Sequence, residues 1–185
     1  MKLKFIPLVL LAAAPILLGC GTPVYSDPQG HFTVELTGGW YEQTDALSDL
    51  SEKGDEFVLS LGAFHERTEA YFVVKIWKSP LCERCENLIR GNSGDGQRLL
   101  GFAKDWLWEA QNKIRDVVSH GDIVLVEGER GLFVEVETTH DTTKSIRRFY
   151  ASQSGVMLET ICGATKSRWR LSMCTDILDT LVVSR

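Results

Sequence analysis

The fold is decided by the stretch from Asp122 to Gly163, which reads DIVLVEGERGLFVEVETTHDTTKSIRRFYASQSGVMLETICG. Apolar and β-branched residues recur there in short runs, and polar turns separate the runs. This pattern predicts strands that are joined by turns short enough for antiparallel pairing. The four predicted strands are Asp122 to Glu127, Gly131 to Thr139, Ser145 to Ser152 and Val156 to Gly163.

Helices are predicted on either side of this four-strand meander. Residues 99–118 carry apolar side chains at helical spacing, which predicts the longest helix of the chain. The segment from Ser167 to Val183 repeats apolar residues at intervals of three and four, with Ser167 as its predicted N-cap. Both helices have one apolar face, so we expect each to pack against the sheet.

The part before the long helix is predicted to be rich in strands. His31 to Leu36 alternates apolar and polar residues, which is typical of a half-buried strand before a turn at Gly38-Gly39. Glu56 to Phe64 and Ala70 to Trp77 are predicted to form a hairpin. Together with the meander and helices, these elements predict an α+β domain in which an antiparallel β-sheet is covered by helices.

The order of these elements resembles a known fold. The opening strand Phe32-Thr33-Val34-Glu35-Leu36, a turn glycine and Trp40, followed by hairpin, long helix, meander and last helix, is similar to the PsbP-like fold. That fold includes small bacterial lipoproteins of the DcrB and LpqN kind, and the likeness covers residues 31–185. It implies an α/β/α sandwich that acts in binding or assembly. It implies no functional residue.

The first twenty residues look like a targeting segment. Two lysines precede an apolar run from Phe5 to Leu18, which is shorter than the roughly 20 residues that a membrane-spanning helix needs. Leu17-Leu18-Gly19-Cys20 then resembles the lipobox of bacterial lipoproteins. That resemblance implies cleavage after Gly19 and attachment of lipid, including fatty acids such as palmitate, to Cys20. Two or three acyl chains would make a stable membrane tether.

The chain is therefore predicted to have three parts. Residues 1–19 are the signal peptide, residues 20–30 a lipidated tether and residues 31–185 a single globular domain. Gly21 stands where lipoproteins kept in the inner membrane often have aspartate, so a Gram-negative host would place the protein in the periplasmic leaflet of the outer membrane. The alternative is an ordinary secretory signal with a chance cysteine.

Composition indicates a folded, acidic domain. The chain has 44% hydrophobic and 24% charged residues and a formal net charge of -5. Nucleic-acid binders usually show a basic patch, whereas lysine and arginine are scattered here. We expect no nucleic-acid partner. We expect a membrane contact through the lipid on Cys20 and a protein partner in the cell envelope.

The cysteines beyond Cys20 are predicted to form disulfides. Export places them in an oxidising compartment, where an even number of cysteines tends to pair. We favour Cys162 with Cys174, because a short turn brings the last helix back over the end of the last strand. Cys82 would then pair with Cys85. Crossed pairings and free buried thiols are the alternatives.

The Cys82-Glu83-Arg84-Cys85 motif is the strongest candidate for chemistry. Cys-x-x-Cys is typical of thiol oxidoreductases, but the cis-proline of the thioredoxin-like family cannot occur here, because no proline follows Pro80. The motif is also half of a zinc site, without a second half. His65-Glu66-Arg67-Thr68-Glu69 lacks the second histidine of a metalloprotease motif. We predict no catalytic residue, metal or cofactor.

Three classes of function remain. The leading hypothesis is a non-enzymatic, membrane-tethered binding or assembly module of the cell envelope. The alternatives are an envelope thiol-disulfide oxidoreductase that uses Cys82 and Cys85, and a carrier of a small apolar ligand. A carrier would need an apolar cavity between the sheet and its helices.

Overall fold

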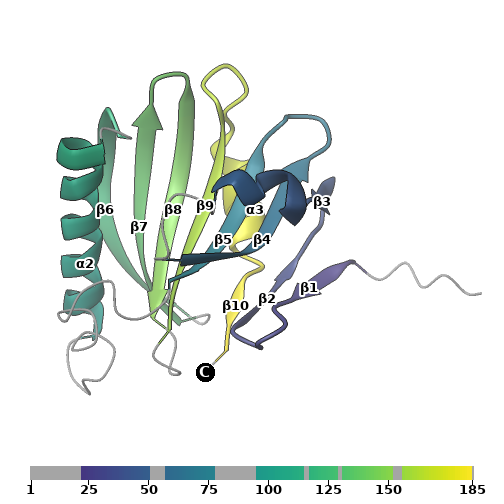
Figure 1. Cartoon of the computed structure of the whole chain (residues 1–185), viewed down its shortest axis with the longest axis horizontal. Helices are drawn as coiled ribbons and strands as arrows, with labels where there is room; N and C mark the ends of the chain where they lie inside the picture. The colour runs from purple at the N-terminus through teal and green to yellow at the C-terminus, as the bar shows by residue number, and fades with distance from the viewer. Residues whose placement is uncertain are drawn as a thin grey trace, which may run out of the picture.

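The chain folds into two antiparallel sheets and a small number of helices (Figure 1). The computed structural model describes residues 22–50, 57–77, 95–114, 117–128, 131–151 and 156–184. Within these ranges, one sheet has three strands and the other has seven.

The seven-stranded sheet contains the predicted hairpin and meander. Its strands, in spatial order, are β3 (Trp40–Glu42), β4 (Phe57–His65), β5 (Tyr71–Trp77), β9 (Met157–Thr165), β8 (Thr143–Ala151), β7 (Gly131–His140) and β6 (Ser119–Gly128). β6 to β9 pair in chain order, because short turns join them. The last of them, β9, pairs with β5 and so connects the meander to the hairpin.

The three-stranded sheet joins the two ends of the described chain. β1 (Val24–Ser26) and β10 (Val182–Val183) flank β2 (Phe32–Glu35). β2 is the predicted opening strand. β1 was not predicted, and it lies inside the segment 20–30 that was expected to be a tether, so that expectation fails for residues 24–26. The turn after β2 places Gly38 at φ 67° and Gly39 at φ 99°, a conformation that glycine adopts without strain.

The helices differ in extent from the predicted ones. α2 (Asp95–Glu109) continues as a π-helical turn, η2 (Ala110–Ile114), and the 3-10 helix η1 (Thr44–Leu50) follows β3. α3 (Leu171–Leu178) is shorter than the predicted helix over residues 167–183. Its N-cap position is Arg170, which makes no side-chain capping bond, so the prediction of Ser167 as the cap is wrong. Its predicted end forms β10, because backbone pairing with β2 replaces the last helical turns.

The predicted fold class is wrong. The structure is mostly β, because its described ranges contain ten strands in two antiparallel sheets and only two short α-helices. It is not the helix-covered α+β sandwich expected from the sequence, nor the α/β/α sandwich that the PsbP-like resemblance implies. The physical reason is that the small sheet packs Phe32 and Val34 into the core, where helical cover was expected.

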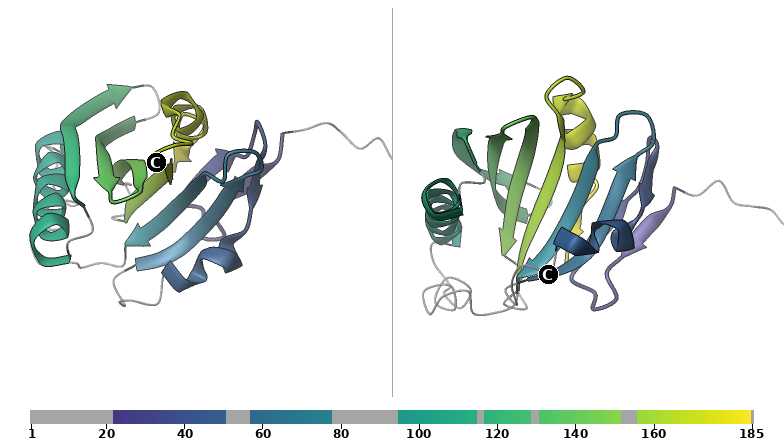
Figure 2. Two further views of the ribbon diagram at one scale, coloured as in Figure 1. Left: turned by 90° about the horizontal axis from the view of Figure 1, so that it is seen from above. Right: turned by 45° about the horizontal axis from the view of Figure 1, so that its top comes forward.

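Two apolar cores lie on opposite faces of the large sheet, because side chains alternate along each strand. On β8, Ile146 and Tyr150 join the core beneath α3 and the small sheet, whereas Phe149 joins the core beneath α2. We call these the α3 face and the α2 face. Figure 2 shows α2 beside the β6 end of the large sheet and α3 near β9. Within the described ranges, no helix has the length and apolar character needed to cross a membrane.

Candidate functional site

Three of the predicted site residues lie outside the described residues. These are Cys20, the predicted lipid attachment site, and Cys82 and Cys85 of the Cys-x-x-Cys motif. Their roles therefore stay predictions. The other two, Cys162 and Cys174, are both described.

Cys162 and Cys174 form a disulfide, as predicted. Cys162 lies on β9 and Cys174 on α3, their Cα atoms are 5.5 Å apart, and both side chains are buried. β9 runs toward the short turn that precedes α3, and the apolar face of α3 turns the second cysteine onto the sheet. The bond therefore fixes α3 to the centre of the large sheet.

A buried carboxylate lies at the centre of the α2 face. Glu159, on β9, is 1% exposed. Arg147 Nη1 donates a hydrogen bond of 2.6 Å to Oε1, and Trp77 Nε1 donates one of 3.1 Å to Oε2. Each oxygen of this carboxylate thus accepts a hydrogen bond from a neighbouring side chain. We call Glu159, Arg147, Trp77 and Trp106 the α2-face cluster.

The cluster connects the sheet to α2 through an arginine. The guanidinium of Arg147 lies 4.7 Å from the centre of the Trp106 ring, which belongs to α2. A cation over a tryptophan ring is attracted by the ring's negative face. Arg147 Nε is buried and has no hydrogen-bond partner among the described residues. The ion pair therefore joins β8 to β9, and the cation-π contact connects this pair to α2.

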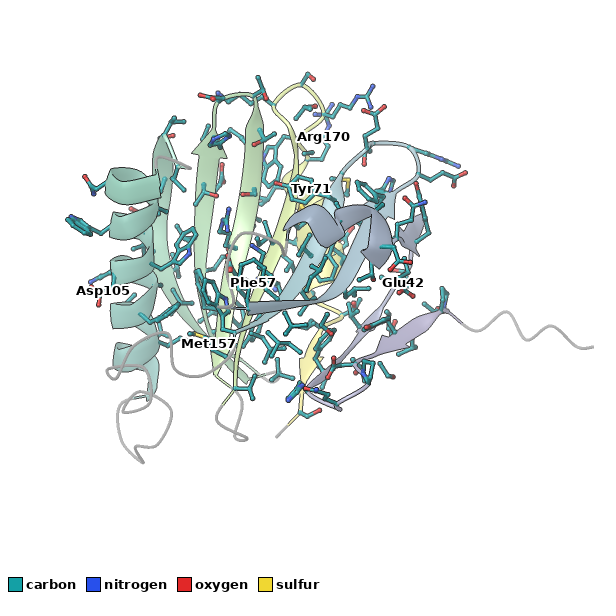
Figure 3. All side chains as sticks on the ribbon, viewed as in Figure 1. Glu42, Phe57, Tyr71, Asp105, Met157 and Arg170 are labelled. Atoms are coloured by element: carbon teal, nitrogen blue, oxygen red, sulfur yellow. A yellow bond between two sulfur atoms is a disulfide. The ribbon has the colours of Figure 1, made fainter. Side chains whose placement is uncertain are left out.

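Aromatic side chains surround this cluster on the hairpin side. Lys75 Nζ lies 4.3 Å from the centre of the Phe57 ring, and Figure 3 labels both Phe57 and Tyr71. Burial raises the pKa of Tyr71, and the charge of Arg147 partly offsets that effect.

A Cβ atom on Gly163 would be only 2.5 Å from the Tyr71 hydroxyl oxygen. Glycine at this position therefore lets the end of the Tyr71 ring pack directly against β9.

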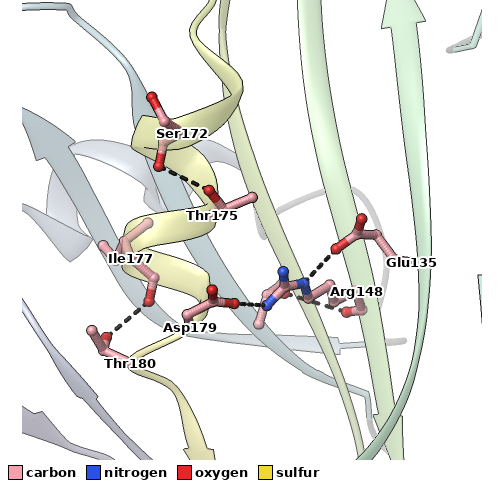
Figure 4. A network of polar contacts seen from close by, with 8 residues as sticks. Glu135, Arg148, Ser172, Thr175, Ile177, Asp179 and Thr180 are labelled. Atoms are coloured by element: carbon pink, nitrogen blue, oxygen red, sulfur yellow. Dashed lines mark hydrogen bonds and ion pairs between the residues drawn. The ribbon is translucent and has the colours of Figure 1, made fainter. Parts of the chain in front are cut away.

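A second arginine forms a network on the α3 face (Figure 4). Arg148 Nε donates a hydrogen bond of 2.6 Å to Glu135, and its Nη1 donates one of 2.9 Å to Asp179, which follows α3. The guanidinium also lies 4.6 Å from the centre of the Phe133 ring. Burial raises the pKa of the neighbouring Tyr150 to about 12, so its hydroxyl stays protonated at neutral pH. The network fixes the end of α3 to β7 and β8.

A third polar cluster joins the two sheets. Asp27 Oδ2 lies 2.8 Å from His31 Nδ1, and Asp27 Oδ1 accepts a hydrogen bond of 2.6 Å from Ser60. Ser60 lies in β4 at a register shift between Leu59 and Leu61, which turns its side chain toward Asp27. Although serine, histidine and aspartate meet here, the carboxylate lies between the other two. A serine nucleophile needs the imidazole in that middle position.

The pKa of Asp27 is lowered in the folded protein. Burial alone would raise it, but hydrogen bonds from Ser60 and from the backbone and side chain of His31 outweigh that effect. The carboxylate is therefore ionised at neutral pH, and each of its two oxygens has a hydrogen-bond partner. Its chemistry is that of a structural anchor between the N-terminal hairpin and β4.

These three clusters were not predicted from the sequence. Lysine and arginine looked scattered along the sequence, yet the side chain of Arg148 is only 7% exposed and pairs with carboxylates. The one signal in the sequence is Glu159, an acid inside the apolar run Val156 to Gly163. A charge within a predicted buried strand requires a partner.

Glu135 and Glu137 alternate along β7 and so lie on the same face of the sheet. Both side chains are about a third or more exposed, at 30% and 41%, but each pairs with a cation, Arg148 and Lys144 respectively. Among the described residues, no group of three or more histidine, cysteine, aspartate or glutamate side chains could hold a metal ion.

No protein-family model matches this chain, and no curated protein matches it.

Proposed function

We propose that this protein is an exported lipoprotein, held at a membrane of the cell envelope by lipid on Cys20, whose folded domain is a non-enzymatic binding or assembly module. The observation that carries the proposal is the buried Cys162–Cys174 disulfide, taken together with the lipobox Leu17-Leu18-Gly19-Cys20. In a Gram-negative host, the proposed location is the periplasmic leaflet of the outer membrane.

The disulfide supports export because such bonds form and persist mainly in oxidising compartments. Cys162 and Cys174 are buried in the core between β9 and α3, so the bond is part of the folded structure rather than an accessible redox pair. An exported chain with a lipobox is the substrate of lipid attachment. The disulfide and the lipobox are therefore both features of a chain that has been exported across the membrane.

The charged clusters support a non-enzymatic role. Glu159, Asp27 and Arg148 are the buried charged groups whose partners are described, and each is held by at least two neighbours. A general base needs a lone pair that faces a substrate. These groups instead fix helices and sheets to each other, which suits a rigid module that presents a surface.

The experiment is to replace Cys20 with serine in the full chain and to express it in a bacterial host with labelled palmitate. We expect the parent to incorporate the label and to sediment with membranes after a high-salt wash. The Cys20→Ser variant should do neither, because a hydroxyl replaces the only thiol that the lipobox offers. The proposal is wrong if the variant still incorporates label or still sediments.

The oxidoreductase alternative rests on the spacing of Cys82 and Cys85. A structural disulfide typically has a reduction potential below about -300 mV, whereas catalytic pairs lie higher, at about -120 to -270 mV. A potential in the higher range for the Cys82–Cys85 pair would favour the enzyme. A potential below it would favour the binding module.

The carrier alternative gains no support from the described residues. One surface depression among the described residues, of about 380 Å³, is lined by Glu42, Gln43, Thr44, Asp45 and Ala46, where β3 leads into η1. Four of these side chains are polar or charged, whereas a carrier of an apolar ligand needs an apolar lining.

A further inference from the structure

β6 is an outer strand of the large sheet with apolar side chains on both faces. In the described part of the chain, its one neighbouring strand is β7. Val124 is 48% exposed and Leu125 is 36% exposed, and they point to opposite faces because they are adjacent in a strand. The ladder with β7 is regular from Ile123 to Gly128.

Outer strands of natural sheets usually carry features that prevent pairing with another chain. These are charges, proline, bulges or very short length. β6 has a register irregularity between His120 and Ile123, which protects only its first half. The second half begins Ile123-Val124-Leu125-Val126, without charge or proline. This half presents a row of backbone groups and exposed apolar side chains suited to one more strand.

We propose that β6 pairs antiparallel with β6 of a second copy of this chain, centred on Leu125, so that two seven-stranded sheets join into one. In this register Leu125 lies opposite itself across a two-fold axis, and Val124 lies opposite Val126 of the second copy. Such β-branched pairs stabilise a sheet. Asp122 lies opposite Gly128, so no acidic side chains face each other, although each chain carries a net charge of -5.

The other possible pairings are less favourable. Centring the pair on Val124 would bring only residues 123–125 of the regular segment opposite one another, whereas centring on Leu125 brings residues 123–127 together, although it places Glu127 opposite Ile123. Pairing β6 with the other outer strand, β3, would offer only three residues, including Glu42. That contact would also be head-to-tail and leave free edges, whereas the pairing of β6 with itself closes as a symmetric dimer.

Cross-linking tests the register. The exported full chain with Cys20→Ser would receive Leu125→Cys, and the matched control would receive Val124→Cys, an exposed neighbour on the same strand. Opposed Cα atoms lie about 4.5–5.5 Å apart, whereas two Val124 positions would be about 8 Å apart, beyond the reach of a disulfide. We expect a covalent dimer under mild oxidation from Leu125→Cys, above the background of the parent, and none from Val124→Cys. Absence of the Leu125 dimer, or an equal yield from Val124→Cys, overturns the proposal.

Sedimentation equilibrium tests the association itself. A lysine on an outer strand opposes pairing, so Leu125→Lys should raise the dimer dissociation constant by at least about tenfold. Leu171→Lys is the control, because Leu171 is also an exposed leucine, at 52%, but lies on α3. Its dissociation constant should stay within about twofold of the parent. A parent that stays monomeric up to about millimolar concentration, or a Leu125→Lys variant that dimerises like the parent, contradicts the proposal.

Discussion

At the scale of single residues, the two adjacent arginines of β8 show how the strand distributes charge. Arg147 points to the α2 face and pairs with Glu159, whereas Arg148 points to the α3 face and pairs with Glu135 and Asp179. Their opposite directions follow from the two-residue repeat of a strand. Each guanidinium is tolerated in an apolar layer because at least one carboxylate pairs with it and an aromatic ring lies against it.

Removing the charge of Glu159 should destabilise the protein strongly. Glu159→Gln keeps the shape of the side chain but leaves Arg147, whose side chain is 18% exposed, without its counter-ion. We expect a loss of about 2–4 kcal/mol in the free energy of unfolding, measured by urea denaturation. Glu137→Gln is the control, because the Glu137–Lys144 pair is 3.1 Å long but largely exposed. It should cost less than about 0.5 kcal/mol. Equal losses for the two variants would contradict this account.

Asp27 should make the free energy of unfolding depend on pH in the acidic range. Its folded-state pKa lies below its ordinary value, so its contribution is complete above the unfolded pKa of about 4 and is lost as pH falls through the lower folded pKa. Asp27→Asn should therefore flatten the fall in unfolding free energy between about pH 5 and pH 2. Ser60→Ala removes one of the hydrogen bonds that lower the pKa and should flatten it in part. An unchanged pH profile in Asp27→Asn would refute this role.

At the scale of elements, local patterns predicted six of the seven strands of the large sheet, all but β3, but only β2 of the small one. The hairpin of β4 and β5 and the meander of β6 to β9 follow from alternation and short turns. β10 is two residues long and pairs Val182 with Thr33, near the other end of the chain. Such a strand has no local signal, because its pairing depends on tertiary contacts that override helical propensity. The fold class was wrong for this reason.

Two glycines in different elements should respond oppositely to alanine. Gly101 is exposed in α2 and a Cβ there would meet nothing within 4 Å, so Gly101→Ala should stabilise the protein by about 0.5–1 kcal/mol. A Cβ on Gly163 would meet the Tyr71 hydroxyl at 2.5 Å and Ser145 Cβ at 3.0 Å. Gly163→Ala should therefore destabilise by about 1–2 kcal/mol. Thermal unfolding of both variants measures this, and effects of the same sign would contradict the packing described for β9.

The disulfide, which holds α3 against the large sheet, should contribute a large part of the free energy of unfolding. Its cysteines are 12 positions apart, and closing a loop of this length is worth about 3 kcal/mol in the chain-entropy model. The double variant Cys162→Ala, Cys174→Ala should lose about that amount in urea denaturation, and reductant should then have little further effect on it. Identical stability of the oxidised parent and the double variant would show that the bond stabilises nothing.

At the scale of the whole molecule, the large sheet carries a core on each face, and the polar clusters tie the surrounding elements to it. The Cys162–Cys174 pair could be predicted because β9 and α3 are consecutive and joined by a short turn. The Arg147–Glu159 pair could not, because it depends on the register of β8 against β9, in which these two residues are diagonal neighbours. Sequence therefore located the covalent link but not the buried charges.

The most direct test of the proposed lipoprotein identity is the intact mass of the protein isolated from the membranes of a bacterial host. The account predicts a chain that begins at Cys20, carries lipid on that residue and retains the Cys162–Cys174 bond. A chain that keeps residues 1–19, or one that begins at Cys20 without lipid, would contradict it.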